Sequence, residues 1–136
     1  GEKTMKIFSW DLLGSQNGYG NNNITAVNIA NVREVIESEK PDICILYSYW
    51  LAYADKLELE KLGYECTVNL DYPERDCRNR VLVAAKFPFS IKSAPTSLKF
   101  YKKDWQEIEL VSEGRRIICL QLKSPLRSRI RWKTKR

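Results

Sequence analysis

Residues 40–50 read KPDICILYSYW, and this stretch decides the fold. Within it the segment Asp42–Tyr47 is a nearly continuous apolar run, which is typical of a strand whose two faces are both buried. Pro41 restricts the residue before it to extended conformations, so a helix that approaches from the N-terminal side is expected to end there. The stretch therefore predicts the junction between a helix and a buried strand.

The residues before this stretch predict another strand and the helix that joins the two strands. A short strand is expected over Met5–Trp10 and a helix over Ile24–Glu39, with Asn22 or Asn23 as its N-terminal cap. Apolar residues recur at helical spacing in the second segment, at Ile29, Val32, Val35 and Ile36. Strand, helix and buried strand in this order predict a βαβ unit.

The residues after this stretch predict one more helix and then only strands. Ser48 is expected to cap a helix over Tyr49–Leu62 that ends at Gly63. Beyond it, short runs rich in β-branched and aromatic residues alternate with turn signals. The predicted strands are Tyr64–Leu70, Val81–Lys86, Ser90–Ala94, Leu98–Tyr101, Gln106–Val111 and Arg116–Leu122. The expected fold class is therefore α/β (α+β).

Length and composition predict one domain over residues 1–136, since the chain is long enough for a core but short for two domains. Residues 1–4 precede Met5 and are expected to be the remnant of a tag. No apolar run approaches the roughly 20 residues that cross a bilayer, so no membrane segment or membrane partner is expected.

The cysteine and histidine content limits the compartment and the chemistry. The cysteines show no C-x-x-C spacing, and three of the four lie in apolar or strand-like runs: Cys44, Cys66, Cys77 and Cys119. They predict reduced, mostly buried thiols and a cytoplasmic, intracellular protein. The chain has no histidine, which excludes Ser-His and Cys-His catalysis and histidine-bearing zinc sites.

The net charge of +6 arises at the C-terminal end. In RSRIRWKTKR, residues 127–136, basic residues alternate with other residues, so an extended segment would have one basic face. That face could neutralise phosphates while an aromatic ring stacks on a base. A charged edge strand or a solvated tail explains the same pattern. The binding candidates here are Lys123, Arg127, Arg129, Arg131, Trp132 and Lys133.

Five segments follow one another as landmarks of a known superfamily: KIFSWDLLG, KPDICILYSYW, LGYE, NRVLVAAKFPFS and RRIICLQLKSP. With these segments in this order, nearly the whole chain resembles the endonuclease/exonuclease/phosphatase superfamily. The resemblance implies a DNase I-like fold, a sandwich of two mixed sheets with helices packed on the outside, present here in shortened form. It also implies Mg²⁺-dependent hydrolysis of phosphodiesters or phosphomonoesters.

The sequence departs from the superfamily pattern at the implied site. Asp11 stands where the first strand commonly ends in a metal-holding Asn, an exchange that keeps an oxygen ligand and makes Asp11 a weak metal candidate. Ser48 stands where the second strand commonly ends in the principal metal carboxylate, a Glu. Lys123 stands where a later strand has a phosphate-directed His, and Gln121 precedes it. The further Asp-x-Asn and Asp-His motifs have no counterpart in these residues.

Each of these positions also has a purely structural interpretation. Asp11 would cap the Gly/Asn loop after its strand, Ser48 would cap a helix, and Lys123 would be a solvated lysine. A replacement carboxylate could come from the loop residues Glu74 or Asp76.

The same loop is also a candidate surface for anions. Asn79 matches the substrate-side Asn of the resemblance, and the basic residues around it are Arg75, Arg78 and Arg80.

Metal-assisted phosphoryl transfer needs a cation, a positioned water and charge stabilisation, and the sequence lacks the implied residues for all three. It therefore predicts a degenerate, catalytically silent domain without a cofactor, with a basic surface for nucleic acid or another phosphate-bearing partner. The alternatives are a Mg²⁺-dependent nuclease or phosphatase whose missing half lies in another chain, and a protein-interaction or assembly subunit.

The landmarks account for little more than one sheet, and the inner face of that sheet must be covered. A homodimer, a second protein, or a rearranged second sheet from residues 98–111 is expected to pack on it. The face is expected to carry Val81, Val83, Ile118 and Leu120, or their neighbours Leu82, Ala84, Ile117 and Cys119.

Overall fold

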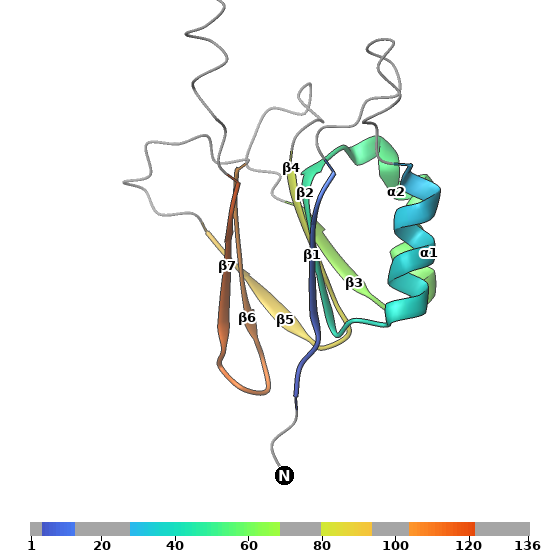
Figure 1. The fold of residues 1–136 in the computed structure, drawn as a ribbon. Coiled ribbons are helices and arrows are strands. Elements are labelled where there is room, and N and C mark those ends of the chain that lie inside the picture. Colours follow the sequence, from blue (N-terminus) through green and yellow to red (C-terminus); the bar gives the residue numbers. More distant parts are fainter. Residues whose placement is uncertain (1–3, 13–27, 69–79, 94–103, 122–136) are drawn as a thin grey trace, which may run out of the picture.

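The computed structural model describes residues 4–12, 28–68, 80–93 and 104–121, which form two sheets and a layer of helices (Figure 1). Sheet A has the strand order β1 (Ile7–Asp11), β2 (Ile43–Tyr49), β4 (Arg80–Ala85) and β3 (Glu65–Val68). Sheet B has the order β5 (Phe89–Lys92), β6 (Trp105–Leu110) and β7 (Arg116–Leu120). The expected mixed α/β sandwich is confirmed.

The helical layer covers the face of sheet A that points away from sheet B (Figure 1). It consists of α1 (Ile29–Glu39), α2 (Ala54–Leu57) and the 3-10 turns η1 (Leu51–Tyr53) and η2 (Leu59–Leu62). Strands β1 and β2 are parallel, with α1 between them in the sequence, so the predicted βαβ unit is confirmed. Strand β4 pairs antiparallel with both β2 and β3.

The start of α1 lies later in the chain than the sequence pattern predicted. Asn28 is the N-cap, and its side-chain oxygen accepts a hydrogen bond of 3.0 Å from the N–H of Ala30. The predicted caps Asn22 and Asn23 are therefore wrong, since a third asparagine, directly before the first residue of α1, Ile29, satisfies the helix terminus. The C-terminal end at Glu39 agrees with the prediction.

The helix predicted over Tyr49–Leu62 is wrong. Strand β2 continues to Tyr49, and the following residues form η1, α2 and η2, which are interrupted at Glu58 with φ 46°. The left-handed residue turns the chain so that Leu57 and Leu59, on either side of it, are both buried. Gly63 ends the segment with φ 93°, as predicted.

The predicted strands have described counterparts in five of six cases. The segments Tyr64–Leu70, Val81–Lys86, Ser90–Ala94, Gln106–Val111 and Arg116–Leu122 correspond to β3, β4, β5, β6 and β7, with ends that differ by at most two residues. Leu98–Tyr101 lies outside the described residues.

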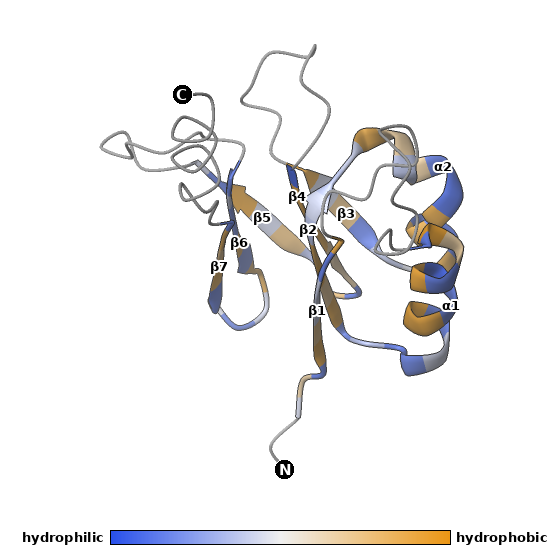
Figure 2. Ribbon diagram, turned by 45° about the horizontal axis from the view of Figure 1, so that its top comes forward, coloured by the Kyte–Doolittle hydropathy of each residue, from blue (hydrophilic) through white to orange (hydrophobic). Residues whose placement is uncertain are grey.

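Two hydrophobic clusters flank sheet A, because successive side chains of β2 and β4 point to opposite faces. Both strands consist mostly of hydrophobic residues (Figure 2). Cys44, Leu46, Leu82 and Ala84 face the helices and pack with α1. The alternate residues face sheet B and pack with its inner side: Ile43, Ile45, Val81, Val83 and Ala85 meet Ile108, Leu110 and Cys119.

The inner face of sheet A is thus covered at β2 and β4 by a second sheet of the same chain. Val81 and Val83 lie on that face and are fully buried, while Leu82 and Ala84 face the helices. The expectation that residues of β7 share the first sheet is wrong: Cys119 and Ile117 cover the face from sheet B, and Ile118 is half exposed. Sheet B extends further than predicted, from Phe89 to Leu120, because β5 and β7 flank β6.

The cysteines within the described ranges are free thiols: Cys44 and Cys119 are buried, and Cys66 is partly buried. None of the described helices is long and apolar enough to span a bilayer.

Candidate functional site

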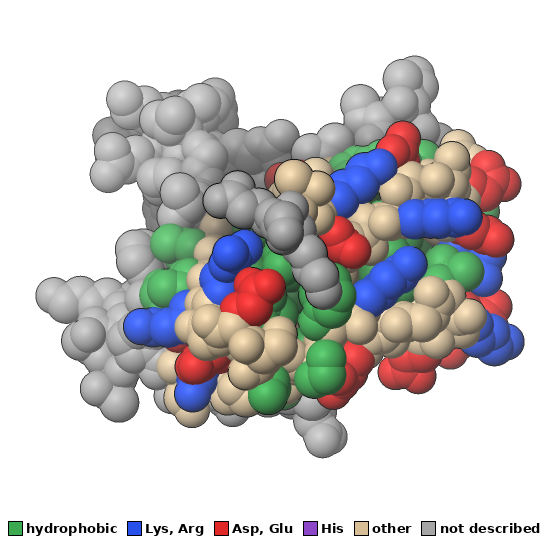
Figure 3. Space-filling view, turned by 90° about the horizontal axis from the view of Figure 1, so that it is seen from below, with side chains coloured by type: hydrophobic (Ala, Val, Ile, Leu, Met, Phe, Trp, Pro, Cys, Tyr) green, Lys and Arg blue, Asp and Glu red, His purple; other side chains and the backbone are tan. Residues whose placement is uncertain are grey.

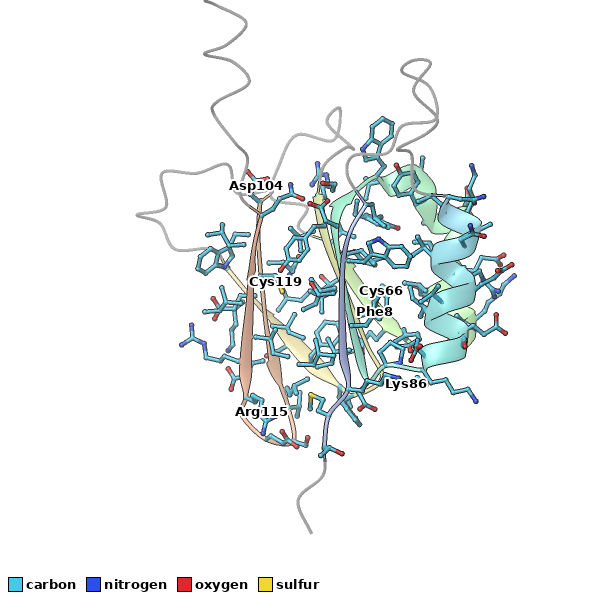
Figure 4. The ribbon with its side chains drawn as sticks, viewed as in Figure 1. Phe8, Cys66, Lys86, Asp104, Arg115 and Cys119 are labelled. Carbon is cyan, nitrogen blue, oxygen red and sulfur yellow. The ribbon has the colours of Figure 1, made fainter. Side chains whose placement is uncertain are left out.

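The ends of several strands bring polar side chains to one edge of the sandwich. Asp11 ends β1, Ser48 lies near the end of β2, Asp104 precedes β6, and Gln121 follows β7. These four residues, called the polar edge below, come from both sheets. Figure 4 shows Asp104 at the upper end of β6, the edge at which β1 and β2 also end.

A chain of hydrogen bonds connects the four residues. The Ser48 hydroxyl donates to Asp11 Oδ1 at 2.9 Å, and the Ser48 backbone N–H donates to Gln121 Oε1 at 2.5 Å. Gln121 Nε2 in turn donates to Asp104 Oδ1 at 2.9 Å. Asp104 and Gln121 are both buried, so the chain holds sheet A to sheet B where water has little access.

An irregularity in β2 gives Ser48 its position. The register of β2 against β4 shifts between Leu46 and Tyr49, and Ser48 has φ 56°. Such a bulge redirects a side chain at the end of a strand. The helix N-cap predicted for Ser48 is wrong, because Trp50 precedes η1 and the hydroxyl of Ser48 is bound to Asp11.

Two substitutions of Ser48 should distinguish the stabilisation from its hydrogen bond to Asp11 from the cost of its left-handed backbone conformation. We expect Ser48→Ala to lower the free energy of unfolding by about 1 kcal/mol, because the bond to Asp11 is lost and a side chain remains at positive φ. Ser48→Gly should lose less, since glycine relieves about 1 kcal/mol of left-handed strain. Urea unfolding of both variants measures the difference. A glycine variant less stable than the alanine variant would contradict the strained geometry.

Two further residues lie between the sheets beneath the polar edge. Tyr47 donates a hydrogen bond to the Cys119 thiol, and burial, followed by the thiol and the Asp11 carboxylate, raises the pKa of Tyr47. Burial raises the pKa of Cys119 to about 11. Both groups therefore stay protonated at neutral pH, and neither supplies a nucleophile.

The described residues of this edge do not fit a resident Mg²⁺ ion. Hard cations of this kind take several oxygen ligands, usually with carboxylates among them. Asp11 is exposed, one of its oxygens accepts the Ser48 hydroxyl, and the Asp104 carboxylate is bound to Gln121. No group of three or more acidic or cysteine side chains within the described ranges could hold a metal ion.

The structure describes only one of the predicted phosphate-binding residues. Arg80 is the first residue of β4 and is 1% exposed, so it lies in a strand and not in the loop before it, and its phosphate-binding role stays a prediction. The other candidates, and the loop carboxylates, lie outside the described residues: Arg75, Arg78, Asn79, Lys123, Arg127, Arg129, Arg131, Trp132 and Lys133, with Glu74 and Asp76. Their roles remain predictions.

Asp104 is a site residue that no sequence motif predicted. The signal was nevertheless present, because β6 and β7 form an antiparallel pair in which Trp105 lies opposite Leu120. That register places Asp104 beside Gln121, whose N–H donates to the Asp104 carbonyl at 2.8 Å. An acidic residue immediately before one strand of a hairpin thus meets the residue immediately after the other.

The described surface has no excess of positive charge. Acidic residues outnumber basic ones in the described ranges, and the two signs alternate over the face seen from below (Figure 3). The positive net charge of the whole chain therefore belongs to residues outside these ranges.

No known protein family matches the sequence, and no curated protein is similar to it in sequence. Solved structures are similar in fold. Truncated TDP2 from Caenorhabditis elegans has a TM-score of 0.61 and 14% identity over 93% of this chain and 49% of its own. The 3′ phosphatase NExo (D146N) from Neisseria, bound to a product DNA hairpin, has a TM-score of 0.60 and 17% identity over 96% and 49%.

An AP endonuclease from Archaeoglobus fulgidus is similar to the same degree, with a TM-score of 0.61 and 13% identity over 95% of this chain and 48% of its own. All three proteins are members of the endonuclease/exonuclease/phosphatase superfamily. The similarity shows that the chain has the DNase I-like fold in partial form. The chain spans about half the length of these structures.

Proposed function

We propose that this chain is a DNase I-like domain that does not hydrolyse phosphoesters on its own and that binds nucleic acid or another phosphate-bearing partner. The hydrogen bond between Ser48 and Asp11 carries the proposal. The resemblance implies a carboxylate at Ser48, and here a neutral hydroxyl occupies that position and donates a hydrogen bond to Asp11. One carboxylate with one oxygen already engaged is a weak site for a cation that must polarise a phosphoryl group.

Two observations support phosphate binding: a similar structure that holds DNA, and the basic C-terminal residues of this chain. The NExo structure similar to this chain holds a product DNA hairpin. The positive charge of the present chain is concentrated in Lys123–Arg136, where basic residues alternate with Trp132 and other side chains. Lysine and arginine bind phosphate backbones of any sequence, and an aromatic ring adds stacking on bases.

An activity assay tests the catalytic part of the proposal. The purified chain, incubated with Mg²⁺ or Mn²⁺ and a panel of DNA, RNA and phosphomonoester substrates, is expected to give no turnover above the background. The matched variants are Asp11→Ala, at the polar edge, and Asp55→Ala, an exposed acid of α2. Turnover that Asp11→Ala abolishes and Asp55→Ala preserves would overturn the proposal.

A titration with salt tests the binding part. Binding of single-stranded or duplex DNA should be independent of sequence and should weaken with salt, with a log–log slope of about −0.7 to −0.9 per phosphate contact. Changing Arg127, Arg129 and Arg131 to Ser should reduce the slope by about 2 to 3.

The matched control for this titration removes three exposed charges elsewhere, at Lys56, Lys61 and Lys92. Fluorescence anisotropy at several salt concentrations measures both slopes. If the two triple variants behave alike, or if no binding occurs at low salt, the C-terminal residues do not form a phosphate-binding site.

A second candidate function is a Mg²⁺-dependent hydrolase that is completed by residues from another chain. The favouring observation is that Asp11 and Ser48 together carry the single negative charge that an Asn and a Glu would carry, within hydrogen-bonding distance of each other. A complex or longer polypeptide that contains the remaining strands should then hydrolyse a phosphoester with Mg²⁺, and Asp11→Ala in this chain should abolish the activity.

The proposal includes a cytoplasmic, reducing environment. The free thiols of Cys44, Cys66 and Cys119 support it, since buried reduced cysteines are typical of intracellular proteins.

A further inference from the structure

We propose that a cavity on the helix side of sheet A binds a small organic amine that has an apolar body. The cavity, called the acidic pocket below, has a volume of about 420 Å³, which lies within the range of about 300–1,000 Å³ that is usual for small-ligand pockets. Its walls come from the end of β2, from β3 and β4, and from the segment of α2 and η2. Cys66 of β3, labelled in Figure 4, is one of its lining residues. The inference is independent of the proposed function, which concerns the polar edge and the C-terminal residues.

The interior of the acidic pocket is apolar. Leu57 and Leu59 are 1% and 5% exposed, and they lie on either side of Glu58, whose left-handed backbone (φ 46°) turns the chain between them. Leu82 of β4 lines the pocket from the sheet and is also buried. These side chains form a surface on which the apolar part of a ligand leaves water, and this burial is a favourable term in binding.

A buried tyrosine hydroxyl also lines the pocket. Tyr49 is 4% exposed, and its ring packs edge-on against Tyr53 with the ring centroids 5.8 Å apart. Within the described ranges no hydrogen bond engages this hydroxyl, although a tyrosine hydroxyl so deeply buried usually has a partner. Burial, followed by the Cys66 thiol and the Asp55 carboxylate of the same pocket, raises the pKa of Tyr49. The hydroxyl is therefore protonated and can exchange a hydrogen bond with a ligand.

The mouth of the pocket carries an excess of negative charge. Glu58 and Lys61 form an ion pair with each other, so their charges cancel. Asp55 and Glu60 are exposed, and no basic side chain among the described residues forms an ion pair with either of them. Arg33 of α1 also acts on Glu58, and its guanidinium is bound to a second acid of its own helix. Two carboxylates thus remain to bind a cation.

The charge of these carboxylates reaches the interior of the pocket. Burial raises the pKa of Cys66 to about 11, and the carboxylates of Glu60 and Glu65 contribute to the increase. The carboxylate of Asp55 contributes in the same sense to the raised pKa of Tyr49. Both increases mean that a further negative charge is disfavoured here, so the pocket favours a positive one.

An amine with an apolar body satisfies all three features at once. Its ammonium group would lie beside the carboxylates of Asp55 and Glu60, its aliphatic or aromatic part would fill the interior, and the Tyr49 hydroxyl would accept a hydrogen bond from its N–H. The tyrosine ring adds attraction for a cation. A phosphate would be repelled by the same carboxylates, so this ligand differs in class from the phosphate-bearing partner of the proposed function.

Titration of the whole chain with tryptamine, followed by two-dimensional NMR, tests the proposal. We expect a Kd of about 0.1–1 mM, because a ligand of so few atoms makes few contacts. The amide signals of Leu59 and Cys66 should shift, and that of Ile118 on sheet B should not. Two further probes separate charge from shape: indole-3-propionate has the same ring with a negative charge, and methylammonium has the positive charge without the ring. Each should bind at least about tenfold more weakly than tryptamine.

Variants of the lining residues test which groups bind the amine. Asp55→Asn combined with Glu60→Gln should raise the Kd about tenfold, since two charge pairs are lost. The control combines Glu34→Gln with Glu113→Gln, two exposed acids outside the pocket, and should leave the Kd within about twofold. Tyr49→Phe deletes only one hydroxyl and should raise the Kd about threefold to tenfold.

Several outcomes of these titrations would overturn the proposal. They are the absence of tryptamine binding, equal affinities for the three probes, equal Kd values for the two double variants, and a Kd that Tyr49→Phe leaves unchanged.

Discussion

Replacing Val83 with Asp is expected to unfold the chain at 25 °C. Val83 lies in β4 between the two sheets, is fully buried, and belongs to the same cluster as Ile108 and Leu110 of β6. Burial of a carboxylate without a partner costs several kcal/mol, a large part of the about 5–15 kcal/mol that stabilises a typical domain. Far-UV circular dichroism and urea unfolding measure the loss.

Two further variants make this experiment decisive. Val83→Ala should lower the free energy of unfolding by about 1–3 kcal/mol, because it removes apolar volume without adding charge. Ile91→Asp, at a position of β5 that is 62% exposed, should change stability by less than about 1 kcal/mol. If Val83→Asp retained the circular dichroism and urea midpoint of the unaltered chain, sheet B would not cover sheet A in solution.

Replacing Ser48 with Glu is expected to make the stability of the chain depend on a divalent cation. The new carboxylate would lie near Asp11, where Ser48 now donates a hydrogen bond, and would occupy a backbone position with φ 56°. Like-charge repulsion and the loss of the Ser48–Asp11 hydrogen bond together should lower the free energy of unfolding by about 2–3 kcal/mol without a cation. A cation held by both carboxylates should restore about 2.7 kcal/mol at a concentration of 100 times its Kd.

Thermal unfolding with and without Mg²⁺ measures this linkage. The control is Ser48→Gln, which has nearly the same size and strain and no charge, and it should respond to Mg²⁺ no more than the unaltered chain. A strong response of the unaltered chain would show that Asp11 and Ser48 already hold the cation, and would remove the observation on which the proposed function rests.

The elements that the sequence predicted well are those whose signal is local and repeated. Asp42–Tyr47 became the interior strand β2 because every residue from Ile43 to Leu46 has a buried partner on one face or the other. Turn signals around Gly63 and Pro88 likewise marked the ends of their strands. The DNase I-like fold followed from the order of such segments.

The elements that the sequence did not predict depend on contacts between distant residues. The sequence predicts Ser48 as a helix cap because serine is a common cap. In the structure its N–H donates a hydrogen bond to Gln121, 73 positions later, and its hydroxyl donates one to Asp11. Asparagine is a common cap at either Asn23 or Asn28, and the structure begins α1 at Ile29, directly after Asn28. Asp104 lies beside Gln121 only because of the register of β6 with β7.

The order of the two sheets along the chain has a consequence for synthesis on the ribosome. Every strand of sheet A precedes Phe89, whereas the three strands that cover its inner face end only at Leu120. At a synthesis rate of about 5–20 residues per second, the apolar side chains of Ile43, Ile45 and Val83 stay exposed for about 2–7 s until sheet B has been made. During that interval the newly made half-sandwich is a natural client for chaperones that bind exposed apolar strands.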